Sequence, residues 1–423
     1  MLLFFTIKEV SMKRTYGNVA TGDRFWDRKE DLSLLIQRID DGQHVLLVAQ
    51  RRRGKTSLMK EAMARLKDRY TCLFIDLQKA ASAADVIVEL SLATRPFKSL
   101  WDKSKDMFSN ILCRLSETVE EVSVNELGVK LRAGLTNANW AEKGDQLFAI
   151  LASSERPVFL CVDEISIFLN RVLKDDEGTV TSDGRRVVEQ FMSWLRENSI
   201  RHQGAVRMIL SGSIGLEPVL NQAGLSATVN TFAPFELNPW DVETAQGCLD
   251  ALAQEYGIIF HPGATSEMTR QLGCCIPHHV QMFFSHVYDR CVRRNRMDFF
   301  PDEVEAVYNE EMLSIQGHAE LTHYEERLKL VLGPQRFTIA LELLTEAAVV
   351  GRLPKDALRI QRDLHRFPDI DLAKAQREIL EVLQHDGYLR ESNGEFQYIS
   401  KLLRDWWRKR YEAFYTPLAE RTI

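Results

Sequence analysis

One short segment constrains the fold of this chain more than any other feature. Residues 49–57 form the sequence Ala-Gln-Arg-Arg-Arg-Gly-Lys-Thr-Ser, directly after the apolar run HVLLV at 44–48 and before a stretch with helical spacing. A strand, a Gly-Lys-Thr turn and a helix in that order make a loop whose backbone N–H groups converge on phosphate. The usual pattern begins with Gly, and Ala49 can take that place if its φ is negative. The segment predicts a phosphate-binding loop at the edge of an α/β sheet.

The residue types in this loop suit a nucleoside triphosphate with its metal ion. Lys55 would neutralise the outer phosphates, and the Thr56 hydroxyl would bind Mg²⁺. The backbone amides around the β-phosphate would come from Arg52, Arg53, Gly54, Lys55, Thr56 and Ser57. A basic surface turn is the alternative, because Gly-Lys-Thr is a common tripeptide. The predicted strand before the loop and the predicted helix after it favour the phosphate site.

A second motif supplies the acidic groups that such a site needs. The apolar run PVFLCV at 157–162 is followed by Asp163 and Glu164. A buried strand would deliver both carboxylates to the carboxyl edge of the sheet, where open α/β folds bind ligands. Asp163 would hold Mg²⁺ through water, and Glu164 would polarise the water that attacks ATP. One strand, at 71–77, separates the loop from these acids in sequence, as in P-loop enzymes with an inserted strand and a catalytic Glu.

A further strand, at 206–213, ends in Ser211-Gly212-Ser213. A hydroxyl at that position can reach the γ-phosphate and respond to its loss, so we expect this role for Ser211 or Ser213. A plain strand-end turn, which Ser and Gly favour, is the alternative. Such enzymes also use an arginine to stabilise transition-state charge. The sequence does not choose among the candidates Arg185, Arg186, Arg196, Arg201 and Arg207.

Apolar runs alternate with helical stretches along residues 17–238, which predicts a parallel sheet covered on both faces. Within that range, the alternation at 124–135 predicts a hairpin or an inserted strand. Residues 240–315 are predicted to be entirely helical, and residues 239–318 to form a lid domain. Residues 319–423 are predicted to form three helices, a hairpin turning at Asn393-Gly394 and a last helix, the order of a winged-helix domain. Residues 1–16 are assigned to an N-terminal extension.

Composition and charge narrow the range of partners. The formal net charge of −6 gives no global basic excess for gripping nucleic acid phosphates. The 7 cysteines contain no CxxC pair, which argues against a zinc site and for a reducing compartment. No apolar run reaches the roughly 18 residues of a membrane-spanning helix, and the first residues lack the flanks of a signal peptide. We therefore expect a cytoplasmic protein without a membrane contact.

Residues 17–62 resemble the opening of the archaeal-type predicted ATPases, which belong with the AAA+-like and STAND signal-transduction ATPases. That family has a Phe-aromatic-Gly-Arg-Glu box, matched here by Phe25-Trp26-Asp27-Arg28-Lys29-Glu30 with Asp27 in the Gly position. The segment ILSGSIGLEPVL matches the family element after the fourth strand. The Gly-x-Pro element of the lid corresponds to Gly273-Cys274-Cys275-Ile276-Pro277, which is two residues longer.

The resemblance implies an α/β P-loop NTPase sheet of AAA+/ASCE type, followed by a helical lid and a C-terminal winged helix. In this family the segment before the first helix packs on the adenine, a role that by position would fall to Val19, Phe25 and Trp26. Pro277 would bring the lid against the nucleotide, and His278 or His279 would either face the nucleotide or pack in the lid. ATP would hold or release the lid and the winged helix, with a protein partner or self-association as the output.

Two other functions compete with this molecular switch. An initiator-like or transposition-helper ATPase would bind DNA through the winged helix, but the helix at 371–385 carries mixed charges. The arginines near Arg294 and those near Arg408 are basic candidates, although we favour solvated helix faces as the explanation of both clusters. A nucleotide-binding scaffold without hydrolysis is the other alternative, prompted by Ala49. We favour the molecular switch, because the charge of the chain does not favour DNA binding.

Overall fold

The computed structural model describes residues 12–15, 17–109, 123–365 and 371–421. These residues fall into two compact units. The sheet unit comprises residues 29–50 and 62–237. The helical unit comprises the described parts of residues 1–28, 51–61 and 238–423. The predicted phosphate loop, from residue 51 onward, therefore belongs to the helical unit, whereas the strand that precedes it belongs to the sheet unit.

A five-stranded parallel sheet forms the core of the sheet unit, which confirms the predicted α/β architecture. The strand order is β2-β3-β4-β1-β5. The strands are β1 (His44–Val48), β2 (Thr71–Asp76), β3 (Val158–Asp163), β4 (Val206–Ser211) and β5 (Phe232–Glu236). Every residue of β3 is buried, as expected for a central parallel strand that is covered on both faces. Because β4 lies between β1 and β3, Ser211 ends its strand between the strand that leads to the loop and the strand that carries the acids.

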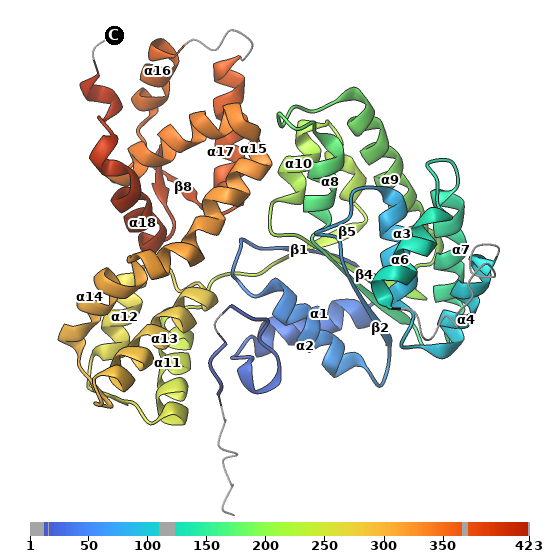
Figure 1. The fold of residues 1–423 in the computed structure, drawn as a ribbon, viewed down its shortest axis with the longest axis horizontal. Coiled ribbons are helices and arrows are strands. Elements are labelled where there is room, and N and C mark those ends of the chain that lie inside the picture. The colour runs from blue at the N-terminus through green and yellow to red at the C-terminus, as the bar shows by residue number, and fades with distance from the viewer. Residues whose placement is uncertain (1–11, 16, 110–122, 366–370, 422–423) are drawn as a thin grey trace, which may run out of the picture. The chain divides into compact units, whose positions relative to one another are not determined.

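Helices cover both faces of this sheet, and α8 and α9 lie on the opposite side of the strands from α1 (Figure 1). The helix α2 (Lys55–Leu66) begins in the helical unit and ends in the sheet unit. The other helices of the sheet unit are α1 (Lys29–Asp40), α3 (Ala83–Ala93), α4 (Lys98–Met107), α6 (Val124–Ala133), α7 (Trp140–Ala152), α8 (Ile165–Leu173), α9 (Ser182–Arg201) and α10 (Leu216–Gln222).

The strand predicted at 124–135 is wrong, because these residues form the helix α6. Ser123 and Glu126 make a reciprocal capping box at its N-terminus. Leu127 and Leu131, one helical turn apart, are fully buried against the sheet unit, whereas Val129 is 72% exposed. The apolar residues therefore follow helical spacing on the buried face, and the exposed valine produced the misleading alternation.

The first part of the helical unit after the sheet contains the helices α11 (Val242–Tyr256), α12 (Ala264–Leu272), α13 (Pro277–Arg293) and α14 (Val304–Val307). The prediction that this region is entirely helical needs one correction. Two short strands, β6 (Ile259–Phe260) and β7 (Asp298–Phe299), pair in parallel. Two residues in each strand are too few to give a periodic signal in the sequence.

The C-terminal part of the helical unit contains α15 (Ile315–Val349), α16 (Lys355–Leu364), α17 (Leu372–His385) and α18 (Lys401–Tyr411). Gly333, with a φ of 72°, and Pro334 divide α15 into two helices. The antiparallel strands β8 (Leu389–Ser392) and β9 (Glu395–Tyr398) form the predicted hairpin around Asn393-Gly394. Among the described helices none is both long and apolar enough to cross a membrane.

Candidate functional site

Asp163 lies at the carboxyl end of β3 and is almost fully buried. Its Oδ1 atom accepts the hydroxyl of Ser211, from the end of β4, at 2.9 Å. The same oxygen accepts the backbone N–H of Glu164 at 3.0 Å. Two donors therefore fix the carboxylate at the sheet edge, where a rigid strand end can present it to a ligand.

Glu164 follows directly and has a left-handed backbone, with φ 58° and ψ 27°. This conformation costs a residue with a Cβ about 1–2 kcal/mol, and strain of this kind gathers at functional sites. Its Oε2 atom accepts two hydrogen bonds from Ser213, from the backbone N–H at 2.9 Å and from the hydroxyl at 2.7 Å. Each acid after β3 is thus held by one of the two serines after β4.

Gly212, between these serines, allows the loop after β4 to approach α8 closely. A Cβ atom added to Gly212 would lie 1.9 Å from the hydroxyl oxygen of Ser166. That hydroxyl donates to the carbonyl of Ile214 at 2.9 Å. The sequence alone gave no reason for this glycine beyond a turn, because its requirement comes from a neighbour 46 positions earlier in the chain (212 minus 166).

The predicted phosphate loop has the backbone that anion binding requires. Arg52 and Gly54 have positive φ values of 66° and 92°, and α2 begins at Lys55. Lys55 and Arg53 are both nearly buried. Ala49 is not among the described residues with a positive φ, so the replacement of the usual Gly introduces no backbone strain there. The N-terminus of α2 therefore lies directly behind the loop, and the dipole of a helix favours anions at that end.

The segment that the resemblance places on the adenine is tied to the start of α2. The Ser57 hydroxyl accepts the backbone N–H of Ala20 at 3.0 Å, and Glu61 accepts that of Gly22 at 3.3 Å. Val19, next to Ala20, is 45% exposed and Phe25 is partly exposed. Ser57 therefore uses its side chain to hold this segment, while its predicted role toward phosphate rests on its backbone amide.

The Phe25-Trp26-Asp27 box joins this segment to α11. Trp26 donates its indole N–H to the carbonyl of Thr244 in α11 at 3.1 Å, and the Thr244 hydroxyl donates to Asp27 at 3.2 Å. Asp27 has a φ of 47°, which explains why the resembling family uses Gly in this position. Arg28 donates to the carbonyl of Arg53 at 3.1 Å, so the box also contacts the loop.

Pro277 is the first residue of α13, the position where proline fits a helix best. His279, two residues later, is 1% exposed, and its Nε2 atom lies 3.4 Å from the hydroxyl of Tyr324. Burial lowers the pKa of His279 well below its ordinary value, and the nearby charges of His278 and Arg52 lower it further. Of the two alternatives for His279, the structure supports a packed, neutral side chain.

Among the candidate arginines, Arg186 pairs with Asp183, and Arg201 pairs with Asp145 and Glu197. Arg207 lies on β4 with its guanidinium over the ring of Tyr70. These three side chains already have neighbours within the sheet unit.

The structure brings together the predicted acids and serines, and it places the loop, the N-terminal segment and α11 in contact. Thr244 and Ser166 were missed, because each acts on residues far away in sequence.

The sequence matches no protein-family model and no curated protein. The fold of this chain is, however, similar to those of solved structures. A Walker-type ATPase of Pyrococcus abyssi aligns over 94% of this chain and 99% of its own, with a TM-score of 0.59 and 14% identity. The chain has the α/β fold of a P-loop NTPase. The ORC2 protein of Aeropyrum pernix, solved with ADPNP and ADP, aligns over 91% of this chain and 93% of its own, with a TM-score of 0.49 and 13% identity.

Proposed function

We propose that this chain binds ATP with Mg²⁺ and hydrolyses ATP as a molecular switch of AAA+/STAND type. The observation that carries the proposal is the arrangement after β3 and β4, where each acid accepts a hydrogen bond from its own serine. A P-loop NTPase fold needs a fixed carboxylate for the metal and an oriented carboxylate for the attacking water. Asp163 and Glu164 fit these two roles in that order.

The loop supplies the remaining groups. Lys55 neutralises the β- and γ-phosphates, and the amides from Arg52 to Ser57 surround the β-phosphate. The left-handed turn at Gly54 and the helix that begins at Lys55 fit an anion at this place. Thr56 and Asp163 provide the oxygen ligands that Mg²⁺ prefers, and the ion would neutralise developing charge on the phosphates. Ser211 and Ser213 hold the two carboxylates in position.

The contacts of the N-terminal segment suggest how nucleotide occupancy could be transmitted. Residues 20–28 are bonded to the start of α2, to the loop and to Thr244 of α11. We infer that residues 239–318 act as a lid and residues 319–423 as a winged-helix domain, whose arrangement follows the nucleotide state. Such a switch requires ATP to bind one arrangement more tightly than the other. Val19 and Phe25 would pack on the adenine, and Pro277 would bring the lid against the nucleotide.

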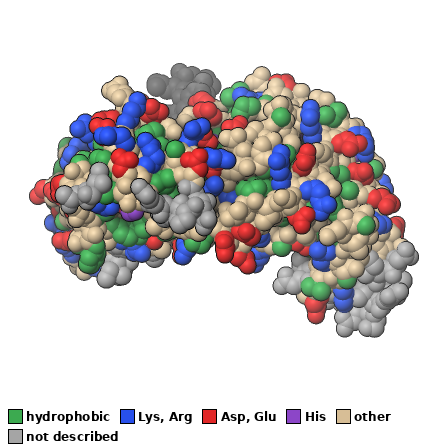
Figure 2. Space-filling model, turned by 90° about the horizontal axis from the view of Figure 1, so that it is seen from above, with side chains coloured by type: hydrophobic (Ala, Val, Ile, Leu, Met, Phe, Trp, Pro, Cys, Tyr) green, Lys and Arg blue, Asp and Glu red, His purple; other side chains and the backbone are tan. Residues whose placement is uncertain are grey.

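The nucleotide state would control binding to a protein partner or to a second copy of the chain. On the face shown in Figure 2, basic and acidic side chains are interspersed. In the last helix Arg404 pairs with Asp405, and Arg408 pairs with Glu412. Arg290 pairs with Glu310. Paired charges of this kind leave little net positive potential for a nucleic acid backbone.

The test uses purified full-length protein and two variants. Glu164→Gln should lower kcat by about a hundredfold or more while Mg²⁺·ATP still binds, because only the base is lost. Lys55→Ala should abolish nucleotide binding in calorimetry. Glu217→Gln, an exposed acid on α10, is the matched control and should behave as wild type. Absence of ATP binding to well-folded wild-type protein would refute the proposal, and unchanged turnover in Glu164→Gln would refute the role of that carboxylate.

A further inference from the structure

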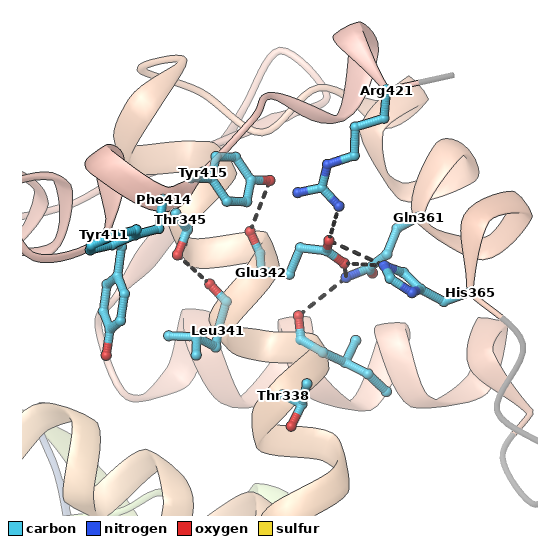
Figure 3. Close-up of a pocket in the computed structure, with 11 residues that line it drawn as sticks. Thr338, Leu341, Glu342, Thr345, Gln361, His365, Tyr411, Phe414, Tyr415 and Arg421 are labelled. Carbon is cyan, nitrogen blue, oxygen red and sulfur yellow. Dashed lines mark hydrogen bonds and ion pairs between the residues drawn. The ribbon is translucent and has the colours of Figure 1, made fainter. Parts of the chain in front are cut away.

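A cavity of about 310 Å³ lies in the C-terminal part of the helical unit, remote in sequence from every residue assigned to the nucleotide site (Figure 3). Its walls come from the second half of α15, from the C-terminal ends of α16 and α18, and from the residues that follow each of these two helices. The lining residues that matter here are Leu341, Glu342, His365, Tyr411, Phe414 and Arg421. A volume of this size is at the lower end of those that hold small ligands, about 300–1,000 Å³.

The chain after α18 is held firmly enough to form a wall. Tyr415 donates its hydroxyl to Glu346 at 2.8 Å, and the backbone N–H of Leu418 donates to the same carboxylate at 3.0 Å. Leu418 and Glu346 are buried. Phe414, by contrast, lines the cavity and is 95% exposed. An aromatic ring left in water at the edge of a cavity gains burial when an apolar ligand covers it.

The polar wall is built around Glu342, whose carboxylate already has three side-chain partners. Oε2 accepts from Gln361 at 2.7 Å, and Oε1 accepts from Arg421 at 2.5 Å. The ring of His365 lies within 3.0 Å of the same carboxylate. Burial acts to raise the pKa of Glu342, but the hydrogen bonds from Gln361, Arg421 and His365 outweigh it and the pKa is lowered. A ligand ammonium would therefore compete with three donors for this carboxylate.

Arg421, in contrast, keeps donor capacity at the cavity wall. Its Nε atom donates to the carbonyl of Thr416 at 2.9 Å, and Nη1 donates to Glu342. Its guanidinium lies over the ring of Tyr415, 5.0 Å from the centroid. Within the described chain, no acceptor is bonded to Nη2 of Arg421. A guanidinium with an open N–H group beside an apolar wall is suited to a carboxylate, which it binds by charge-assisted hydrogen bonds.

We propose that this cavity binds a small aromatic monocarboxylate. The carboxylate accepts a hydrogen bond from Nη2 of Arg421, and the ring packs against Leu341, Tyr411 and Phe414. Bound there, the ligand bridges α15 and the chain after α18, and so stabilises the contact between them. The site does not depend on the proposed nucleotide chemistry, because it shares no residue with the loop or with the acids after β3.

The test is calorimetric titration of the full chain with phenylacetate. Phenylacetamide and phenethylamine serve as neutral and cationic probes of the same shape. We expect saturable binding of phenylacetate, with each of the other two probes at least about tenfold weaker, because a charge-assisted hydrogen bond is lost. Arg421→Gln should weaken phenylacetate binding by about tenfold or more. Arg359→Gln, an exposed arginine on α16, should bind as wild type does.

A second variant tests the cavity itself. Leu341→Trp fills the space beside the rings and should abolish binding, with a circular dichroism spectrum and cooperative melting that show a folded chain. The proposal is overturned by no saturable binding up to about 10 mM phenylacetate, which is weaker than a useful contact would give. It is also overturned by equal binding of phenethylamine, or by wild-type affinity in Arg421→Gln or in folded Leu341→Trp.

Discussion

Ser211 donates its hydroxyl to Oδ1 of Asp163 at 2.9 Å, and this bond joins the end of β4 to the end of β3. Both side chains are almost entirely buried. Since the two strands are neighbours in the sheet, the bond crosses a single interstrand spacing and adds no loop that could move. The carboxylate that we assign to Mg²⁺ is therefore oriented by the sheet itself.

Removing this hydroxyl should weaken the proposed Mg²⁺ site and the fold to a similar degree, because both use the same hydrogen bond. In Ser211→Ala we expect the Mg²⁺ concentration for half-maximal ATP hydrolysis to rise roughly fivefold, because one hydrogen bond is worth about 1 kcal/mol. The free energy of unfolding should fall by a similar amount. A Mg²⁺ titration of hydrolysis and a urea titration measure the two effects. An unchanged Mg²⁺ dependence would show that Ser211 does not orient the ligand.

Ser213 should affect turnover without affecting affinity. Its hydroxyl and backbone N–H both hold Oε2 of Glu164, so Ser213→Ala removes one of two orienting bonds. We expect kcat to fall about tenfold, with little change in the Kd for ATP. Ser213→Thr keeps the hydroxyl and should recover most of the activity. Equal losses in the alanine and threonine variants would point to disturbed packing instead.

A side chain at Gly212 should clash with Ser166, and a second substitution at Ser166 should relieve that clash. Gly212→Ala would place its Cβ 1.9 Å from the Ser166 hydroxyl, which must then move. We expect a loss of about 1–3 kcal/mol of unfolding free energy, the usual cost of overpacking. In a Ser166→Ala background the loss should be smaller, since the clashing atom is absent. Strictly additive effects in this double-mutant cycle would contradict the contact.

His44, at the start of β1, should make stability depend on pH. Its Nδ1 atom accepts the N–H of Met208 at 3.1 Å, and Nε2 donates to the carbonyl of Ser199 at 3.0 Å, so the folded chain holds a neutral ring. Burial lowers the pKa of His44 below its ordinary 6.5, against the raising effect of the Ser199 bond. The unfolded chain therefore takes up a proton first as pH falls. The contribution of His44 is full above pH 6.5 and is lost as pH falls from there toward the lowered folded pKa.

Unfolding free energies measured at about pH 7.5 and about pH 5.5 test this dependence. The decrease between the two should be smaller in His44→Gln, whose amide has a donor and an acceptor but does not titrate. His323→Gln, at a partly exposed position, is the control and should keep the wild-type difference. If His44→Gln also keeps it, the buried imidazole is not the titrating group.

The sequence determined where the main strands of the sheet unit lie along the chain and which two acidic residues follow the apolar run of β3. Buried parallel strands are continuous apolar runs, so HVLLV, TCLFIDL and PVFLCV could be recognised in the sequence before their neighbours in the sheet were known. The loop was recognisable because Gly-Lys-Thr stands between a strand and a helix. Asp163 and Ser211 could be expected at one edge, because all parallel strands end on the same side. The helix α6 was missed, since a single exposed Val129 gave a local alternation that only packing could overrule.

Tertiary structure alone decided which atoms meet. Nothing local links Ser213 to Glu164, Gly212 to Ser166, or Thr244 to Trp26, which lies 218 positions earlier. The cavity beside Arg421 likewise depends on how the chain after α18 returns to α15. The spacing of apolar residues in a sequence indicates which face of a helix or strand is buried, because each buried position favours an apolar residue independently of the others. A hydrogen bond between distant side chains depends on the docking of whole elements, and that geometry has no local signature.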